Sequence, residues 1–221
     1  MMNVTVIIVA AGEGKRFGSA KQFALLRGKP VLDWALEAFE SHMKVKEIIL
    51  VVREDWLRDK YMRRYKKLTA VVRGGKRRQD SVIAGFRQVE PKKTDIVLVH
   101  DGVRPLVGKG LITRVIEAAA QKKAAVPAIP VEDTVKRVEG DRVLCTLERK
   151  SLYRIQTPQG FSYATIEKAL REAEKENFYG TDEASLVERM GGDVYIVEGE
   201  AQNIKITSPA DIPVAEALCE D

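Results

Sequence analysis

A loop rich in alanine and glycine, followed by basic residues, is the part of this sequence with the clearest capacity for chemistry. It reads Ala10-Ala11-Gly12-Glu13-Gly14-Lys15-Arg16, and Lys21 follows shortly after. Small residues let backbone amides approach a phosphate closely, and the amides together with nearby cations offset its charge. The loop therefore predicts a site for a phosphate-bearing ligand.

Two common phosphate loops do not fit this pattern. A P-loop requires a second glycine that is followed by lysine and then serine or threonine, and the sequence has no such run. A dinucleotide loop requires a third glycine where Phe17 stands, and an acidic residue roughly 20 residues further on, at the end of a second strand. That interval ends near Asp33, inside a predicted helix. A nicotinamide-dependent dehydrogenase is therefore disfavoured.

Composition narrows the possible partners. Hydrophobic residues make up 45% of the chain and charged residues 31%, and the net charge is +5. A basic balance suits nucleic acids, anionic membranes or small polyanionic substrates. The basic run Lys76-Arg77-Arg78 is short, no basic tail is present, and no apolar run approaches the roughly 20 residues that span a bilayer. We expect small polyanions, and neither nucleic acid nor membrane, as partners.

The few cysteines and histidines do not indicate a metal or disulfide framework. Cys145 and Cys219 lack metal-ligand spacing, and His42 and His100 are not accompanied by clustered carboxylates. A reducing cytoplasm is the expected location. The apolar stretch before the glycine loop has no basic region in front of it, so we interpret it as a core strand and not as a signal peptide.

Strands and helices alternate through the first 130 residues. The patterns predict strands over residues 4–10, 47–52, 69–73, 95–100 and 124–130, and helices over 30–39, 55–67, 81–89 and 110–122. Such alternation predicts an α/β fold with a Rossmann-like, mostly parallel sheet flanked by helices. We expect one domain over residues 1–221.

The rhythm changes after Pro130. Residues 134–146 form two short polar stretches around Gly140, which predicts a hairpin. Because an isolated hairpin is only marginally stable, we expect an arm at about residues 132–152 to pack against a second copy of the chain. Helices are expected over 162–176 and 182–189, strands over 194–198 and 203–206, and a last helix capped by Ser208.

The glycine loop with Arg16 and Lys21 resembles the signature of the sugar nucleotidyltransferases. Further segments appear in order: Gly74-Gly75, Asp80-Ser81-Val82, the run from Val99 to Pro105, Asp133-Thr134, Thr157-Pro158-Gln159, the run from Thr181 to Ser185, and Asn203-Ile204-Lys205. Their order and spacing, from Val4 to the last helix, resemble the 2-C-methyl-D-erythritol 4-phosphate cytidylyltransferases of non-mevalonate isoprenoid synthesis.

The resemblance implies that CMP is transferred from CTP to 2-C-methyl-D-erythritol 4-phosphate, with release of pyrophosphate and with Mg²⁺ as cofactor. It implies a nucleotide site formed by Ala10, Ala11, Gly12, Gly14, Gly75, Ser81, Asp101 and Gly102. Arg16, Lys21 and Lys205 would surround the reacting α-phosphate, and Asp101 would help to hold the metal. Such a reaction needs positioned cations more than a general base, because a phosphate monoester is already nucleophilic.

For the acceptor, the resemblance implies a site shared between two subunits of a homodimer. Thr134 and Arg149 on the arm would bind the acceptor phosphate in the neighbouring subunit, and Thr157 and Thr181 would complete the pocket. The sequence departs from the family pattern at Val9, where proline is usual, at Lys76, where an acid often follows the paired glycines, and at Gly102-Val103, where two alanines are common.

Three alternatives remain open. D-ribitol 5-phosphate cytidylyltransferases have the same fold and chemistry with another acceptor, and nucleotidyl transfer to other sugar phosphates is more distant. In a non-catalytic nucleotide-binding domain, the cations Arg16, Lys21 and Lys205 would take no part in catalysis.

Overall fold

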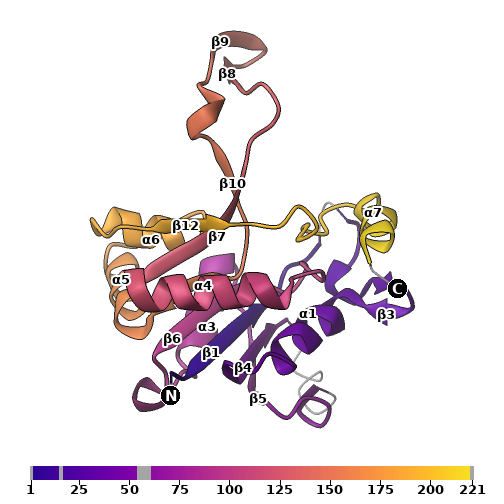
Figure 1. Cartoon of the computed structure of the whole chain (residues 1–221), viewed down its shortest axis with the longest axis vertical. Helices are drawn as coiled ribbons and strands as arrows, with labels where there is room; N and C mark the ends of the chain where they lie inside the picture. Colours follow the sequence, from indigo (N-terminus) through magenta and orange to yellow (C-terminus); the bar gives the residue numbers. More distant parts are fainter. Residues whose placement is uncertain (1, 15–16, 54–60, 220–221) are drawn as a thin grey trace.

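A twisted, mostly parallel sheet with helices on both faces forms the body of the protein (Figure 1). The computed structural model describes residues 2–14, 17–53 and 61–219. The sheet order is β10-β7-β11-β6-β1-β4-β5, and β12 pairs with β7. The strands are β1 (Val4–Val9), β4 (Val45–Val52), β5 (Leu68–Arg73), β6 (Ile96–Asp101), β7 (Ala124–Pro130), β10 (Tyr153–Ile155), β11 (Gln159–Ser162) and β12 (Tyr195–Glu198).

The strand directions confirm the expected Rossmann-like arrangement. β1 lies between β6 and β4 and is parallel to both, β4 is parallel to β5, and β12 is parallel to β7. β11 is antiparallel to β6 and to β7, and β10 is antiparallel to β7. The short strands β10 and β11 were not among the sequence-based expectations.

Helices cover both faces because consecutive buried side chains of each strand point to opposite sides. Val6 and Ile8 pack in one core with α1 (Val31–Glu40) and α4 (Lys109–Lys122). Ile7 packs in the other core, with α3 (Arg78–Phe86), α5 (Tyr163–Lys175) and α6 (Glu183–Arg189). Continuous β-branched strands such as β1 are typical of sheets buried on both faces.

Three local expectations were wrong or shifted. The predicted helix over 55–67 falls partly outside the described residues, and within them helical backbone ends at Met62 and is followed by turns up to the start of β5 at Leu68. Residues 203–206 form no strand; the backbone N–H of Ile206 instead donates to the carbonyl of Val103. The last helix, α7 (Asp211–Leu218), begins at Asp211, whose carboxylate accepts from the backbone N–H of Ser208 at 2.7 Å.

Two small hairpins complete the described chain. β2 (Leu25–Leu26) pairs with β3 (Lys29–Pro30), so Pro30 ends a strand just before α1. β8 (Lys136–Glu139) pairs with β9 (Arg142–Thr146) around Gly140, as the sequence predicts.

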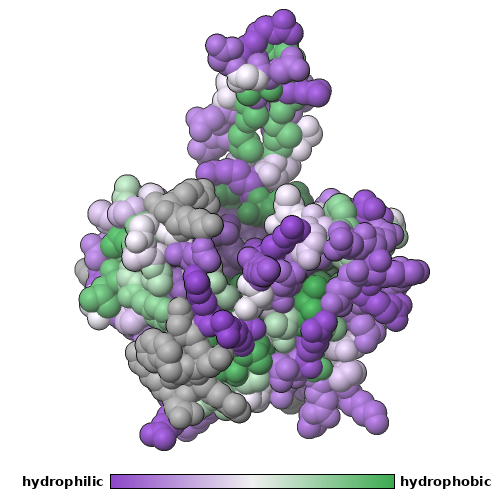
Figure 2. All heavy atoms as spheres, turned by 180° about the vertical axis from the view of Figure 1, so that it is seen from behind, coloured by the Kyte–Doolittle hydropathy of each residue, from purple (hydrophilic) through white to green (hydrophobic). Residues whose placement is uncertain are grey.

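The β8–β9 hairpin projects from the sheet on two connecting segments (Figure 1). We call residues 132–152 the arm. Val138 and Val143 on the arm are each 55% exposed, and Figure 2 shows apolar side chains gathered along it. None of the helices in the described part of the chain combines the length and apolarity that crossing a bilayer requires.

Candidate active site

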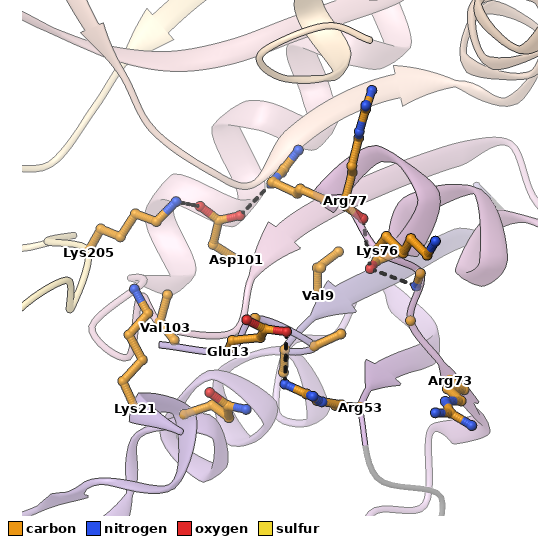
Figure 3. A pocket seen from close by; sticks show the side chains of 18 residues that line it. Val9, Glu13, Lys21, Arg53, Arg73, Lys76, Arg77, Asp101, Val103 and Lys205 are labelled. Carbon is orange, nitrogen blue, oxygen red and sulfur yellow. Dashed lines mark hydrogen bonds and ion pairs between the residues drawn. The ribbon is translucent and has the colours of Figure 1, made fainter. Parts of the chain in front are cut away.

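A pocket of about 440 Å³ lies at the carboxyl ends of β1, β4, β5 and β6 (Figure 3). β1 is followed in sequence by β4 and β5 on one side of it in the sheet, whereas β6 lies on its other side. In doubly wound sheets, ligands bind outside the carboxyl ends of the strands at such a reversal of strand order. The pocket therefore occupies the position where this fold binds nucleotides.

The glycine loop forms one wall of the pocket. Ala10, Ala11 and Gly12 line it, as the sequence predicts, whereas Gly14 does not line it. Gly14 has a φ of +66°, and a Cβ there would lie 1.8 Å from the carbonyl oxygen of Ser19. Gly14 therefore fixes the path of the loop, because no other residue fits that conformation. Arg16 lies outside the described residues.

The turn between β5 and α3 forms the opposite wall together with the start of α3; Gly75 lies in the turn and Ser81 in the helix, and both were expected at this site. The Ser81 hydroxyl accepts from the backbone N–H of Gly75 at 3.2 Å and donates to the carbonyl of Arg77 at 3.1 Å. A Cβ on Gly74 would lie 2.3 Å from the Cβ of Ala11. The two walls can therefore approach each other this closely only because Gly74 and Ala11 are small.

Lys21 and Lys205 both line the pocket and approach its Asp101 end from separate segments (Figure 3). Lys21 belongs to a short 3-10 helix, Lys21–Phe23, and Lys205 lies between β12 and α7. The Lys205 ammonium donates to Asp101 Oδ2 at 2.7 Å. An ammonium has three donors, so this bond still leaves two for a phosphate.

Asp101 ends β6 and is the buried acidic centre of the pocket. Its Oδ1 accepts from Arg78 Nε at 3.0 Å, and Arg104 Nε lies 4.0 Å from its Oδ2. Burial alone would raise the pKa of Asp101, but the positive charges of Arg78 and Lys205 outweigh it and hold the pKa well below its usual range. The carboxylate is therefore ionised at neutral pH.

The donor set around Asp101 fits a nucleotide-bound Mg²⁺, because Mg²⁺ keeps several waters and needs only one or two carboxylates beside phosphate oxygens. Both Asp101 oxygens already bind cations, but each has a second lone pair. The described residues hold no group of three His, Cys, Asp or Glu side chains that could enclose a metal. The geometry therefore suits a metal that enters with its nucleotide.

Thr157 does not line the pocket; it supports Asp101 from behind. Its buried hydroxyl accepts from the backbone N–H of Asp101 at 3.1 Å and lies 3.1 Å from Nδ1 of His100. His100 Nε2 lies 3.2 Å from the carbonyl of Arg104, which assigns the ring proton to Nε2. A threonine and a neutral histidine thus fix the backbone from which the Asp101 carboxylate projects.

We expect His100 to make stability fall in acid. Burial lowers its pKa to about 3, so between about pH 6.5 and pH 3 the unfolded chain binds a proton that the native chain does not. Stability is then lost as pH falls through this window, by up to about 1.4 kcal/mol per pH unit from this residue. Urea unfolding from pH 7 to pH 4 should show a shallower pH dependence for His100→Gln than for the unmodified protein; equal slopes would mean that native His100 takes up the proton.

The remaining expected residues do not line this pocket in the single chain. Thr134, Arg149 and Thr181 are exposed, and Arg149 donates to the carbonyl of Glu132 at 2.5 Å within the arm. Gly102 is buried, and a Cβ there would lie 3.1 Å from the Cβ of Ala10. Gly102 therefore acts on the pocket through packing.

Sequence reasoning missed the part played by Arg78 and Arg53. Arg78 lines the pocket and binds both Asp101 and Glu183, whereas the sequence showed it only as part of the short basic run Lys76-Arg77-Arg78. Arg53 pairs with Glu13 of the glycine loop at 3.1 Å. The acidic partners of both arginines lie far away in the sequence, so no local spacing of residues predicts these contacts.

The structure brings the glycine loop, Lys21, Lys205 and Asp101 to one pocket, which is the arrangement that the sequence predicts for a nucleotidyltransferase. The family model described as 2-C-methyl-D-erythritol 4-phosphate cytidylyltransferase matches residues 4–221. The chain belongs to this family.

Individual relatives agree over nearly the whole length. The chain is 44% identical over 225 residues to a 2-C-methyl-D-erythritol 4-phosphate cytidylyltransferase of Bacillus licheniformis, with 99% of this chain and 96% of the relative covered. The crystal structure of the enzyme with that name from Thermus thermophilus has a TM-score of 0.81 and 38% identity, covering 98% of each chain. A 4-diphosphocytidyl-2C-methyl-D-erythritol synthase from Anaerococcus prevotii has a TM-score of 0.86 and 33% identity, covering 98% of this chain and 95% of that one.

Proposed function

We propose that this protein transfers CMP from CTP to 2-C-methyl-D-erythritol 4-phosphate, giving 4-diphosphocytidyl-2-C-methyl-D-erythritol and pyrophosphate. The observation that carries the proposal is the meeting of Lys21, Lys205 and Asp101 at one end of the nucleotide pocket in a chain of this family. Relatives named for the erythritol acceptor favour it over D-ribitol 5-phosphate.

The reaction needs neither a covalent intermediate nor a general base. An oxygen of the acceptor's phosphate attacks the α-phosphorus of CTP, the bond to the β-phosphate oxygen breaks, and pyrophosphate leaves with the electron pair. Lys21 and Lys205, with Arg16 from the glycine loop, are proposed to offset the negative charge that the two anions bring together. The amides of Ala11 and Gly12 and the Gly75–Ser81 wall are proposed to hold the triphosphate and the cytidine.

Mg²⁺ is the proposed cofactor. Asp101 would hold it, directly or through water, beside oxygens of the triphosphate. The ion would add positive charge where the phosphates crowd. The exposed free thiol of Cys145 suits a reducing compartment such as the cytoplasm, which we propose as the location.

A homodimer is proposed to complete the acceptor site. The arm presents apolar side chains at Val138, Val143 and Leu144, which are 55%, 55% and 40% exposed. Such a patch on a projecting hairpin is typical of a subunit contact. Thr134 and Arg149 would then bind the acceptor phosphate at the neighbour's pocket, beside Thr181 of that neighbour.

Pyrophosphate release tests the proposed reaction. With CTP and Mg²⁺, we expect release with 2-C-methyl-D-erythritol 4-phosphate, and at least about tenfold less kcat/KM with D-ribitol 5-phosphate, because an acceptor of another length misplaces its phosphate. Omitting the acceptor or adding excess EDTA serves as the control and should abolish release. A preference for ribitol would contradict the acceptor assignment, and release with neither acceptor would contradict the reaction.

A further inference from the structure

A chain of ion pairs runs from the pocket into the interior of the protein. Lys205 binds Asp101 Oδ2, and Arg78 binds Asp101 Oδ1 through Nε. Arg78 Nη1 donates to both carboxylate oxygens of Glu183, at 2.7 and 2.9 Å. Three segments distant in sequence thereby support the ammonium of one pocket lysine.

Glu183 is a firm anchor for this chain. Its side chain is 1% exposed, and it is the first residue of α6. The residue before it, Asp182, caps the helix by accepting from the backbone N–H of Ser185, and it accepts from the Gln159 side chain at 2.7 Å. Gln159 also accepts from the backbone N–H of Ala184 at 3.2 Å. The backbone on either side of Glu183 is therefore held in place.

Arg78 is fixed at both ends of its guanidinium. Burial would lower its pKa, but the charges of Glu183 and Asp101 raise the pKa above its ordinary value, so it stays positive. A guanidinium is planar and presents its donors in a rigid fork. Since Arg78 and Lys205 bind different oxygens of Asp101, the carboxylate cannot turn about its axis without breaking one of the two bonds.

We propose that Arg78, anchored by Glu183, is a positioning residue that fixes the Lys205 ammonium at the reacting phosphate by acting through Asp101. This inference rests on the proposed function, in which Lys205 stabilises the transition state. The triphosphate in the ground state is also held by the loop amides and Lys21. Loss of Arg78 therefore affects turnover more than nucleotide binding, because a displaced charge matters most where charge develops.

The expected result for Arg78→Gln is a kcat lowered roughly tenfold or more, with the Kd for CTP, measured by calorimetry without acceptor, within about threefold of the unmodified protein. Arg78→Lys keeps the charge without the fork and should lie between the two. Arg87→Gln is the matched control. Arg87 follows the same helix and pairs with Glu174 at 2.9 Å, but it is 68% exposed, so its loss should leave kcat unchanged.

A double-mutant cycle separates positioning from a general structural role. If Arg78 acts through Lys205, adding Arg78→Gln to Lys205→Ala should lower kcat by less than about twofold beyond Lys205→Ala alone. A multiplicative loss, or an equal change in kcat and CTP affinity, would overturn the proposal. If Arg78→Gln does not fold, Glu183→Gln takes its place in the cycle, because it preserves the side-chain shape and removes the anchor.

The activity of the unmodified protein distinguishes failure of the proposed function from failure of the positioning role alone. If it releases no pyrophosphate, the proposed function is overturned, and the positioning role with it. If it is active and Arg78→Gln has an unchanged kcat, the positioning role alone is overturned.

Discussion

Replacing Lys205 with alanine is expected to lower kcat by roughly 10²-fold or more, with a much smaller effect on the Kd for CTP. Its ammonium is held 2.7 Å from Asp101 Oδ2 at the end of the pocket that Lys21 also approaches. A cation held in place in advance needs no reorganisation when charge develops at the α-phosphate, so its loss raises the barrier by about 2.7 kcal/mol. Steady-state pyrophosphate release and calorimetry with CTP would measure the two effects.

Lys93→Ala is the control for this substitution. Lys93 pairs with Glu90 at 2.7 Å just before β6, at the end of that strand opposite Asp101, and it is 66% exposed. Its removal should leave both kcat and CTP binding unchanged. A Lys205→Ala protein that keeps its kcat would remove Lys205 from the proposed mechanism, whatever the fate of the other cations.

Mixing two inactive variants is expected to restore about a quarter of the unmodified activity. Lys205→Ala disables the pocket of its own subunit, and Arg149→Ala disables the arm that the proposed dimer lends to its neighbour. After the subunits are unfolded together and refolded, half of the dimers combine one variant of each kind. Each of these has one intact site of two, because a two-fold dimer forms both sites from the same pair of surfaces.

The control mixture is Lys205→Ala with Lys21→Ala, since both changes lie in the same pocket. No restoration is expected there, because every site that has an intact Lys205 lacks Lys21. If Lys205→Ala and Arg149→Ala also fail to restore activity, or if the active protein is a monomer by light scattering, the shared site is wrong. Both mixtures use the full-length chain, so their activities do not depend on whether an isolated arm would fold.

The fold class could be predicted from the sequence because the main strands have recognisable local sequence patterns. β1 is a continuous run of β-branched residues, and Gly140 between two polar stretches predicts the hairpin. β10 and β11 were not predicted because they are short and are defined by non-local pairing, β10 with β7 and β11 with β6 and β7. For residues 203–206 an apolar run suggested a strand, but among the described residues this segment is not assigned to a sheet, and the backbone N–H of Ile206 donates to the carbonyl of Val103. The single domain and the dimer stay predictions.

The candidate site was likewise predicted only in part from the sequence. Lys21, Lys205 and Asp101 were chosen from the sequence, and the structure brings them to one pocket. Thr157 was expected in the acceptor site between subunits, and in the single chain its hydroxyl accepts from the backbone N–H of Asp101. Arg78 was noted in the sequence only as part of a short basic run, and in the structure it is a half-buried partner of two buried carboxylates. Nothing in a local spacing distinguishes these outcomes.

The sequence alone predicts the main strands and helices, the small-residue loop after β1 and the charge types of the side chains beside it. These properties are carried by neighbouring residues, through glycine conformation, strand periodicity and charge type. Which charges meet depends on tertiary packing: Asp101 binds Arg78 and Lys205, which are 23 and 104 positions away along the chain. Such meetings depend on how the sheet and its helices pack, because a buried charge is stable only where the fold supplies its partner.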